Sequence, residues 1–530
     1  MTRSMIALSI LAAGLTLTGC EIANQDGGNA DSRQGLNGLV VDGRVAGGKV
    51  WVDSNNNYKI DDFEPYAYTD SDGYYSYNPL TNTNYCSLPV ISDEYQRYCL
   101  LYGSSTNSMI IRIKGGIDLS TGERLKGVMA MSSTISSSSE LSTSPLVLSP
   151  ITTLLSSATT DSAQANIRTA LGITSDTDLR LDFSTASDDR SKRFLANSVA
   201  VQTMMDVLVS SADTGTSEET HFANVINSIS LAVSTNIEPP ATFNNARLSN
   251  LMSVVTTDIS KQTSVASRLA DLNTEINKIS TALNLDAVNA QLKAAEVVSQ
   301  LVKKEVKGND VDAAKKILDA GIGTLNTSLL SGLNDDTVEF DIASITNTLV
   351  DAGKTAVTNN VAFDENEIAG AVNDAKLATG TTWGGQWFVL EATAGDSDDL
   401  EVGSYIAVRL DGTEESSGGR LAVCVNVSVA DSTDPEESMV NEYIGGSWSK
   451  ISAGAVVLNL DYEGQTFEGK MKAKVLEDTD TQQQFRFTTE IDGATEAGDL
   501  VLNANGVSAL ANVAKPTSSA DCANNVDTVL

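Results

Sequence analysis

Six residues with oxygen-bearing groups recur at a regular spacing that suits a hard cation. They are Asp53, Asn55, Asn57, Lys59, Asp61 and Glu64, at positions 1, 3, 5, 7, 9 and 12 of a loop. Position 7 offers its backbone carbonyl, and a glutamate at position 12 binds Ca²⁺ through both oxygens. The spacing predicts a calcium site, which Asp70 and Asp72 could join from the next turn. Tyr58 stands where glycine is usual, and a pair of polar Asx-rich turns without metal is the alternative.

Cys20, which follows a short apolar segment, is a second residue that could be chemically modified. Residues 1–19 contain the basic residue Arg3 and then an apolar run, without acidic residues, that is too short to span a bilayer. The run ends in Leu17-Thr18-Gly19-Cys20, which resembles the lipobox of bacterial lipoproteins. The resemblance implies an export signal that is cleaved before Cys20, and acyl chains on that cysteine. Several acyl chains anchor a protein stably to a membrane, whereas a single acyl chain gives only marginal membrane binding. A plain secretory signal with a chance cysteine is the alternative.

The residues after the cysteine indicate where the anchored chain resides. In lipoproteins an aspartate next to the cysteine is the usual mark for retention in the inner membrane, and here the residue is Glu21. We therefore expect a lipid-anchored protein of the outer membrane that faces the periplasm or the cell surface. Residues 20–37 are rich in small and polar residues, which is typical of a flexible tether.

The other cysteines are even in number and fit an oxidising compartment. Cys86, Cys99, Cys424 and Cys522 remain once Cys20 is assigned to lipid, and an even number in an exported chain favours two disulfides. Four cysteines allow three pairings. The local pairing joins Cys86 to Cys99, and the remaining bond would then tie Cys522 back to a strand at Cys424. Four buried free thiols are the alternative.

Patterns that resemble enzyme motifs lack the residues that would complete them. Residues 43–49 have the spacing of a phosphate-binding loop, but Val50 stands where a serine or threonine must contact Mg²⁺. Ser447 and Lys450 have the spacing of a serine acylase without the partner motifs of that class. No pair of carboxylates stands out among 69 acidic residues as a glycosidase dyad. We therefore predict no catalytic residues.

The elements that must position these residues begin with a β-rich segment, residues 38–130. Short apolar runs are separated there by turn dipeptides such as Asp42-Gly43. The loop from Asp53 to Pro65 and the hairpin sequence from Thr69 to Tyr75 resemble the small Ig-like or prealbumin-like β-sandwich modules of bacterial surface proteins. The segment from Gly115 to Glu123 and the run Ser149-Pro150-Ile151-Thr152-Thr153-Leu154 are similar to the sequence that follows such modules. The resemblance implies surface display, often on modules rigidified by calcium, and no one shared activity.

The middle of the chain predicts a linker and then a helical domain. Residues 131–149 are rich in serine and threonine, which favours a linker, and residues 150–379 show apolar stripes at helical spacing. One stripe consists of Val265, Leu269, Leu272, Ile276, Ile279 and Leu283. A second stripe extends from Val288 to Val306, with Asp286 and Gly308 as expected caps. Pro239-Pro240 should separate two earlier helices. These stripes favour the core of a helical bundle over a groove for a partner.

Residues 380–530 return to the alternation of half-buried strands. Leu421, Val423 and Val425 alternate with other residues in one run, as Met471 and Ala473 do in another. We expect an antiparallel β-sandwich or barrel, so the fold class is a multidomain α+β protein with an N-terminal β-sandwich module and a central helical bundle. Gly385-Gln386-Trp387 is weakly similar to the pattern of lipocalin-like barrels, although such a tryptophan is more often part of the core.

The overall charge of the chain limits the classes of partner that it could bind. Lys and Arg number 35 against 69 Asp and Glu, a net charge of −34, which disfavours nucleic acid because binding to phosphates requires a basic surface. We predict a non-enzymatic, lipid-anchored envelope protein that displays its modules for adhesion, matrix contact or assembly, with a protein or polysaccharide partner at the cell surface. Small-molecule or glycan binding by the C-terminal β domain is the alternative, and an enzyme with an unrecognised site ranks third.

Overall fold

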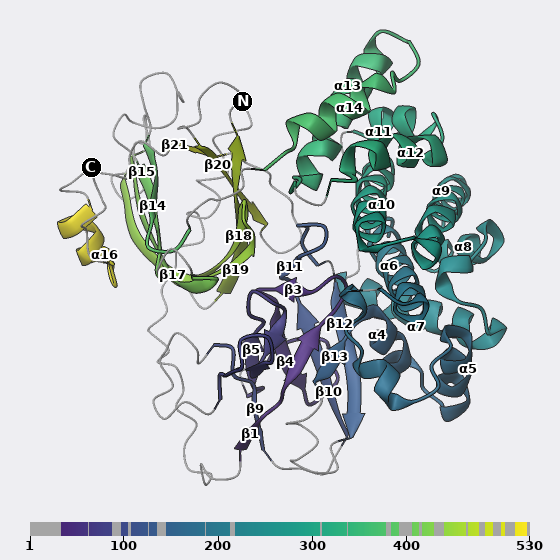
Figure 1. The fold of residues 1–530 in the computed structure, drawn as a ribbon, viewed down its shortest axis with the longest axis horizontal. Coiled ribbons are helices and arrows are strands. Elements are labelled where there is room, and N and C mark those ends of the chain that lie inside the picture. The colour runs from purple at the N-terminus through teal and green to yellow at the C-terminus, as the bar shows by residue number, and fades with distance from the viewer. Residues whose placement is uncertain are drawn as a thin grey trace. The chain divides into compact units, whose positions relative to one another are not determined.

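The structure is a computed structural model with a mixed α+β fold (Figure 1). It describes residues 33–61, 63–86, 97–103, 108–125, 127–134, 145–185, 187–212, 218–307, 310–335, 338–377, 383–391, 405–412, 416–428, 439–462, 465–475, 483–490, 500–503 and 515–526. The described residues up to Lys376 form one compact unit, and those from Leu377 form another.

The first unit begins with short strands in several small sheets. A four-stranded antiparallel sheet has the order β12 (Val128–Thr134), β10 (Ser108–Lys114), β4 (Lys49–Asp53) and β5 (Tyr66–Tyr68). In a three-stranded sheet, β13 (Leu146–Leu148) lies parallel to β2 (Gly38–Val40), which is antiparallel to β6 (Tyr74–Tyr75). The two-stranded pairs are β1 (Arg33–Gly35) with β9 (Leu101–Gly103), β3 (Val45–Ala46) with β11 (Ile117–Asp118), and β7 (Tyr77–Asn78) with β8 (Thr83–Asn84).

Alternation along these strands sends neighbouring side chains into two different cores. Val50 and Val52 of β4 pack among the strands, in a cluster that also contains Ile111 and Leu148. Trp51, between them, points to the opposite face and belongs to the core of the helices. Because successive side chains of a strand point to opposite faces, one strand serves both cores. The β-rich segment and the helices therefore belong to one packed unit.

Both ends of the expected linker, residues 131–149, lie in strands. Residues 131–134 complete β12, and Leu146–Leu148 form β13 against β2. The physical reason is that Leu146, Val147 and Leu148 are apolar and are buried in the two cores. Residues 135–144 lie outside the described residues. The end of the expected tether, residues 20–37, is also ordered into structure, because β1 pairs with β9 and Leu36 is buried.

Helices fill the rest of the first unit. The α-helices are α4 (Pro150–Ser157), α5 (Asp161–Leu171), α6 (Asp189–Ser210), α7 (Glu218–Asn236), α8 (Asn245–Met252), α9 (Ile259–Asn277), α10 (Leu285–Val306), α11 (Val311–Leu318), α12 (Ile322–Leu333), α13 (Ile342–Thr358) and α14 (Asn366–Asp374). Short 3₁₀ turns lie at η2 (Asp176–Arg180), η3 (Phe183–Thr185), η4 (Pro240–Thr242) and η5 (Lys278–Thr281). None of the helices within the described ranges has the length and apolar character needed to cross a membrane.

The predicted helical stripes form the core, with one error at an end. Val265, Leu269, Leu272 and Ile276 are buried on α9, and Ile279 continues the stripe on η5. Leu283 is wrong as a core residue, since it follows the 3₁₀ turn and is 97 % exposed. The cap of α10 also differs, because the side chain of Asn284 accepts the amide of Ala287 while Asp286 lies in the first turn. Gly308 lies outside the described residues.

The second unit is an eight-stranded antiparallel sheet in sequence order that curls on itself (Figure 1). Its strands are β14 (Trp387–Glu391), β15 (Tyr405–Leu410), β16 (Gly418–Ser428), β17 (Met439–Ser452), β18 (Ala455–Tyr462), β19 (Gln465–Val475), β20 (Gln483–Glu490) and β21 (Leu500–Asn503). The curl brings β14 and β21 next to each other. The last described segment consists of α16 (Ser519–Asp521) and a π-helical turn, η7 (Cys522–Val526), and α16 lies outside the curl.

The curled sheet has an apolar cluster on each face. Phe388, Val408, Leu458 and Met471 belong to the cluster on the concave face, together with Trp448. The alternate residues of the same strands face outward, and several of them pack under the C-terminal turn: Trp387, Val389, Tyr405, Ala407, Cys424, Cys522 and Val526. Trp387, which the sequence associates with a barrel, is thus buried beneath the C-terminal turn rather than inside the curl.

Candidate functional site

The predicted calcium loop connects two neighbouring strands of the four-stranded sheet. Asp53 is the last residue of β4, and Glu64 comes just before β5. The carboxylates of these two residues are buried at the base of the loop, whereas Asn55, Asn57 and Lys59 are exposed at its tip. Strand pairing therefore fixes the two ends of the loop and presents its middle to solvent.

Hydrogen bonds draw the side chains of the loop together. The amide nitrogens of Asn55 and Asn57 donate to Asp61 Oδ2 over 2.7 and 2.9 Å. Glu64 closes the loop, because its two carboxylate oxygens accept the backbone amides of Ser54 and Asp61 over 2.6 and 3.2 Å. Five of the six predicted ligand side chains thus lie around one turn, and the side chain of Lys59 stands outside this arrangement.

A residue that the sequence did not indicate, Arg112, occupies the base of the loop. It lies on β10 beside β4, and its Nε is 2.5 Å from Asp53 Oδ2, with both side chains almost fully buried. Its guanidinium lies 3.6 Å from the centre of the Tyr58 ring and also donates to Asn56 Oδ1. Only strand pairing brings Arg112 to Asp53, so local spacing in the sequence could not identify it.

The conformation of Tyr58 explains how the loop turns without the usual glycine. Its φ is +66°, in the left-handed region that non-glycine residues rarely adopt, and Asn56 has a φ of +58°. The Tyr58 amide donates to Asp53 Oδ2, and the ring stacks on Arg112. A cation over an aromatic ring stabilises by roughly 0.5–2 kcal/mol, which is comparable to the cost of an αL residue.

The donor set of the loop fits a cation only in part. Arg112 already supplies positive charge to Asp53, and no group of three or more His, Cys, Asp or Glu in the described part of the chain is arranged to hold a metal ion. Ca²⁺ binding would require Asn55 and Asn57 to turn their oxygens toward Asp61, an exchange of amide orientation that leaves their shape unchanged. Such a site would be held by Asp53, Asn55, Asn57, Asp61 and Glu64 and by the carbonyl of Lys59.

Asp70 and Asp72 have partners of their own. Asp70 is buried, and its oxygens accept hydrogen bonds from the Tyr85 hydroxyl, the Asn78 amide and the backbone amides of Asp72 and Tyr74. Asp72 Oδ2 also accepts from Asn78. Burial raises the pKa of Asp70, and these hydrogen bonds oppose that rise. The arrangement is typical of a carboxylate that organises a hairpin, and these hydrogen-bond donors to Asp70 and Asp72 lie outside the loop of residues 53–64.

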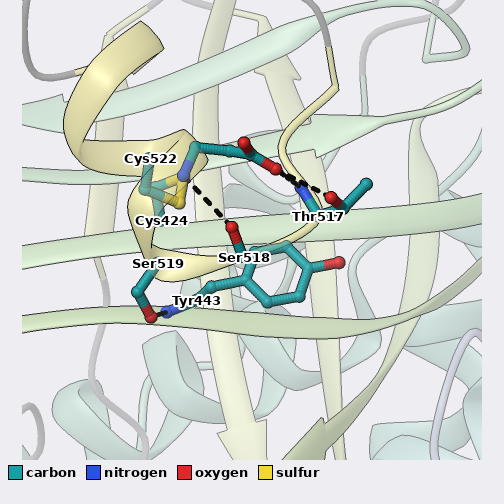
Figure 2. Close-up of a disulfide and its surroundings, with 7 residues drawn as sticks. Cys424, Tyr443, Thr517, Ser518, Ser519 and Cys522 are labelled. Atoms are coloured by element: carbon teal, nitrogen blue, oxygen red, sulfur yellow. Dashed lines mark hydrogen bonds between the residues drawn. A yellow bond between two sulfur atoms is a disulfide. The ribbon is translucent and has the colours of Figure 1, made fainter.

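The four cysteines pair as two disulfides. Cys86 bonds to Cys99, and Cys424 bonds to Cys522. Figure 2 shows how the second bond fastens the C-terminal turn to β16, with Tyr443 N–H donating to Ser519 Oγ and Asp521 accepting from Thr517. Lys515 adds an ion pair with Asp411. Cys20 lies outside the described residues.

No family model, curated protein or solved structure matches this chain. The proposals for this chain therefore rest on its own side chains. The loop of residues 53–64, the buried pair of Arg112 and Asp53, and the two disulfides make up its candidate site.

Proposed function

We propose that the chain is a lipid-anchored protein of the outer membrane, held by acyl groups on Cys20. The observation that carries this proposal is the pairing of the other four cysteines in two disulfides. Disulfides persist in exported proteins and are rare in the reducing cytosol. Because the other four thiols are bonded, the sequence leaves Cys20 for lipid. The protein would face the periplasm or the cell surface.

The proposed task is non-enzymatic display of its modules, for adhesion, matrix contact or assembly. The N-terminal β-rich segment would act as an Ig-like or prealbumin-like sandwich, and the helices as a bundle that supports it. A net charge of −34 would let divalent cations bridge this surface to a protein or an anionic polysaccharide. Nucleic acid is not an expected partner.

The anchor and the partner can be tested in one experiment. Wild-type protein and the Cys20→Ala variant would be expressed in a Gram-negative host, fractionated, and captured from intact cells after crosslinking. We expect wild-type protein in the outer-membrane fraction with fatty acids on its N-terminal peptide, and the variant in the soluble fraction. An unmodified Cys20 in a protein recovered from the cytosol would overturn the proposal.

The same proposal includes calcium in the loop of residues 53–64. Ca²⁺ should raise the melting temperature of the full chain by mass action on the folded state, and a chelator should reverse the shift. Asp61→Asn and Glu64→Gln should each reduce the shift, while Asp364→Asn, an exposed residue far along the chain, serves as the matched control. Equal melting temperatures in millimolar Ca²⁺ and in chelator would mean that the loop is a turn held by Arg112 and by its own hydrogen bonds, without a metal ion.

A second candidate function is small-molecule or glycan binding by the C-terminal β domain. The curl of the sheet and the apolar residues on its concave face favour it. Against it, the side chains of Trp383 and Trp448 are fully buried there, and their indole N–H groups donate to the carbonyls of Ala453 and Asp411. An apolar fluorescent probe should bind the full chain in micromolar amounts if the interior admits a ligand. Absence of binding would leave the interior as a packed core.

A further inference from the structure

The expected tether joins the first unit at Arg33, the first residue of β1. Thirteen peptide links separate Arg33 from Cys20. A fully extended chain of that length spans at most about 45 Å, and a flexible chain of small and polar residues has an average end-to-end distance of roughly 20 Å. Acyl groups on Cys20 would therefore keep Arg33 close to the surface of the membrane.

The strand order places Arg33 near the loop of residues 53–64. In β1 and β9, which lie side by side at the lower end of the β-rich segment in Figure 1, Arg33 pairs with the last residue of β9. Five links later, at Ser108, the chain enters β10, and Ile110 of that strand pairs with Asp53 at the end of β4. Five links span at most about 18 Å. The tether therefore joins the unit near the end of the sheet from which the loop emerges.

Two large rings are exposed where that loop returns to the sheet. Phe63 and Tyr66, three positions apart, expose 60 % and 51 % of their surface. Tyr66 begins β5, the strand beside β4. The Nζ atom of Lys49 on β4 lies 4.1 Å from the centre of the Tyr66 ring, and the Tyr68 ring meets the Tyr66 ring edge-on with 6.2 Å between their centres. An ammonium group and a second ring thus hold the exposed ring in place.

The backbone that carries these rings is fixed from beneath. Glu64, next to Phe63, is buried, and its carboxylate accepts the backbone amides of Ser54 and Asp61. The Val52 amide donates to the carbonyl of the residue before Tyr66 over 3.1 Å, which continues the pairing of β4 with β5. Because the backbone is already ordered, the rings lose little conformational entropy when they enter a contact.

Rings of this kind suit the boundary between lipid and water. Tyrosine combines an apolar ring with a polar hydroxyl, and aromatic side chains gather at the level of the lipid headgroups in membrane proteins. Lys49 can place its ammonium group in the same layer while its methylene stem stays on the apolar side. Attraction to anionic lipids cannot supply the contact, since the chain has a net charge of −34. The anchor makes a weak contact through the rings sufficient, because it raises the effective concentration of this surface at the membrane.

Resting on the anchor proposed for Cys20, we propose that Phe63 and Tyr66 enter the headgroup layer of the membrane that carries the acyl groups. Lipid is the occupant, rather than a second copy of the chain, because the tether joins the unit at this end and keeps it within reach of the bilayer. The loop of residues 53–64 then faces the membrane, and the other faces of the first unit remain available for display.

Tryptophan reporters in the lipidated full chain test this contact, in phosphatidylethanolamine and phosphatidylcholine vesicles with bromine on their acyl chains. Bromine quenches tryptophan fluorescence at short range. The native tryptophans are fully buried, so their signal can be subtracted: Trp51, Trp383, Trp387 and Trp448. We expect Phe63→Trp and Tyr66→Trp each to lose about half or more of the added emission, relative to vesicles without bromine.

Val361→Trp is the matched control for these reporters. Val361 follows α13 and is 52 % exposed, and Figure 1 shows α13 at the opposite end of the first unit from β1. Its added emission should be the same in both kinds of vesicle. Equal quenching of Val361→Trp and the two ring reporters would mean that no particular face meets the lipid, and would overturn the proposal.

The remaining outcomes separate this surface from the anchor. Flotation of the vesicles shows whether the lipidated chain is bound at all, and a chain that does not float overturns the anchor and the contact together. Bound protein in which neither Phe63→Trp nor Tyr66→Trp is quenched overturns the contact while the anchor stands. A blue shift of the Phe63→Trp emission as protein concentration rises in detergent alone would assign the rings to a second copy, and would also overturn the contact with lipid.

Discussion

Arg112 and Asp53 form a buried ion pair whose two members depend on each other. Their side chains are 3 % and 0 % exposed, so removing one leaves the other charge buried without its partner. We predict that Arg112→Met destabilises the first unit by about 3–5 kcal/mol. Urea denaturation followed by circular dichroism measures this. The matched control is Lys354→Met, which removes an exposed lysine that pairs with Asp351 and Asp310 and should cost about 1 kcal/mol or less.

The double variant Arg112→Met, Asp53→Asn distinguishes charge from packing. An asparagine keeps one acceptor oxygen, so it can still accept the Asn57 amide, which donates to Asp53 Oδ1 in the wild type, while the Tyr58 amide, which donates to Oδ2, loses its acceptor. If the cost comes from an unpaired charge, the double variant should be more stable than Arg112→Met alone. A double variant that is less stable would instead assign the cost to the loss of contact between Arg112 and Tyr58.

The Glu296 carboxyl should make the first unit less stable as the pH rises. Burial raises its pKa from 4.5 to about 7, with Asp206 and Glu123 raising it and Lys303 and Gln300 lowering it. Between about pH 4.5 and pH 7 the unfolded chain therefore releases this proton before the folded chain does, and folding stability falls through that window. Glu296→Gln cannot ionise, so its contribution to this fall should be absent.

Melting temperatures from pH 4.5 to pH 8 in chelator measure this effect. We expect Glu296→Gln to exceed the wild type at pH 8 by several degrees, since the pKa shift corresponds to about 3 kcal/mol and 1 kcal/mol shifts the melting temperature of a unit of this size by roughly 1–2 °C. The difference should shrink toward pH 4.5. Glu367→Gln, exposed in the first turn of α14, controls for removal of a surface charge. A difference independent of pH would contradict the assignment.

At the residue scale, the sequence predicted features that depend on the local spacing of residues and on the number of cysteines. The pairing of Cys86 with Cys99 and of Cys424 with Cys522 is confirmed, because the local pair leaves one choice for the remaining two cysteines. Arg112 could not be predicted, since it lies 59 residues from Asp53 and meets it through the pairing of β10 with β4.

At the element scale, the start of α4 connects local sequence to packing. Ser149 caps the helix in a reciprocal arrangement with Thr152, and Pro150 occupies the first turn. The hydroxyl of Thr153 connects the helix to the sheet. Its Oγ1 accepts a hydrogen bond from the Ala130 amide of β12 over 2.8 Å, and the same hydroxyl donates to the Ser149 carbonyl. One hydroxyl thus joins a helix to the edge strand of the four-stranded sheet.

Replacing that hydroxyl by a methyl group should weaken the junction of sheet and helix. We predict that Thr153→Val costs about 1–3 kcal/mol, because the Ala130 amide stays buried without an acceptor. Thr153→Ser keeps the hydroxyl and should recover most of the loss. Thr169→Val removes an exposed helical hydroxyl and is the control. Equal stabilities of the valine and serine variants in urea denaturation would exclude the hydrogen bond as the cause.

Helices with a repeating apolar stripe were predicted well from the sequence. Strands that form only by pairing with a distant segment of the chain were predicted poorly. The stripe on α9 and the break at Pro239-Pro240 are features of local sequence, and the structure has both. The serine-rich stretch of residues 131–149 looked like a linker by composition. Its last three apolar residues nevertheless form β13, because β2 offers a parallel partner that lies more than 100 residues earlier in the chain.

At the scale of the whole molecule, apolar alternation decides which segments belong together. Residues such as Leu39 and Trp51 share a core with the helices, whereas Val40 and Val50 share a core among the strands. The composition of the sequence suggested separate modules. It shows where strands give way to helices, but it does not show that one face of the strands packs against the helices. The break at Leu377 differs, since the strands from β14 onward have apolar clusters of their own.

The two units should therefore unfold in separate transitions, and the disulfide between Cys424 and Cys522 should affect one of them. This bond closes a separation of 98 residues that spans most of the second unit. Chain entropy predicts a contribution of about 4–5 kcal/mol for a loop of that length, with measured values often smaller. We predict that Cys424→Ser, Cys522→Ser lowers the melting temperature of the second unit by about 10 °C and leaves the first unit unchanged.

Differential scanning calorimetry of the full chain measures both transitions at once. The matched control is Cys86→Ser, Cys99→Ser, which opens a loop of 13 residues in the first unit and should lower only the other transition, by a smaller amount. The contrast matters because Cys522 also holds the turn that covers Trp387 and Tyr405. If both variants shifted one common transition, the two units would unfold cooperatively, and the division at Leu377 would not be a boundary of stability.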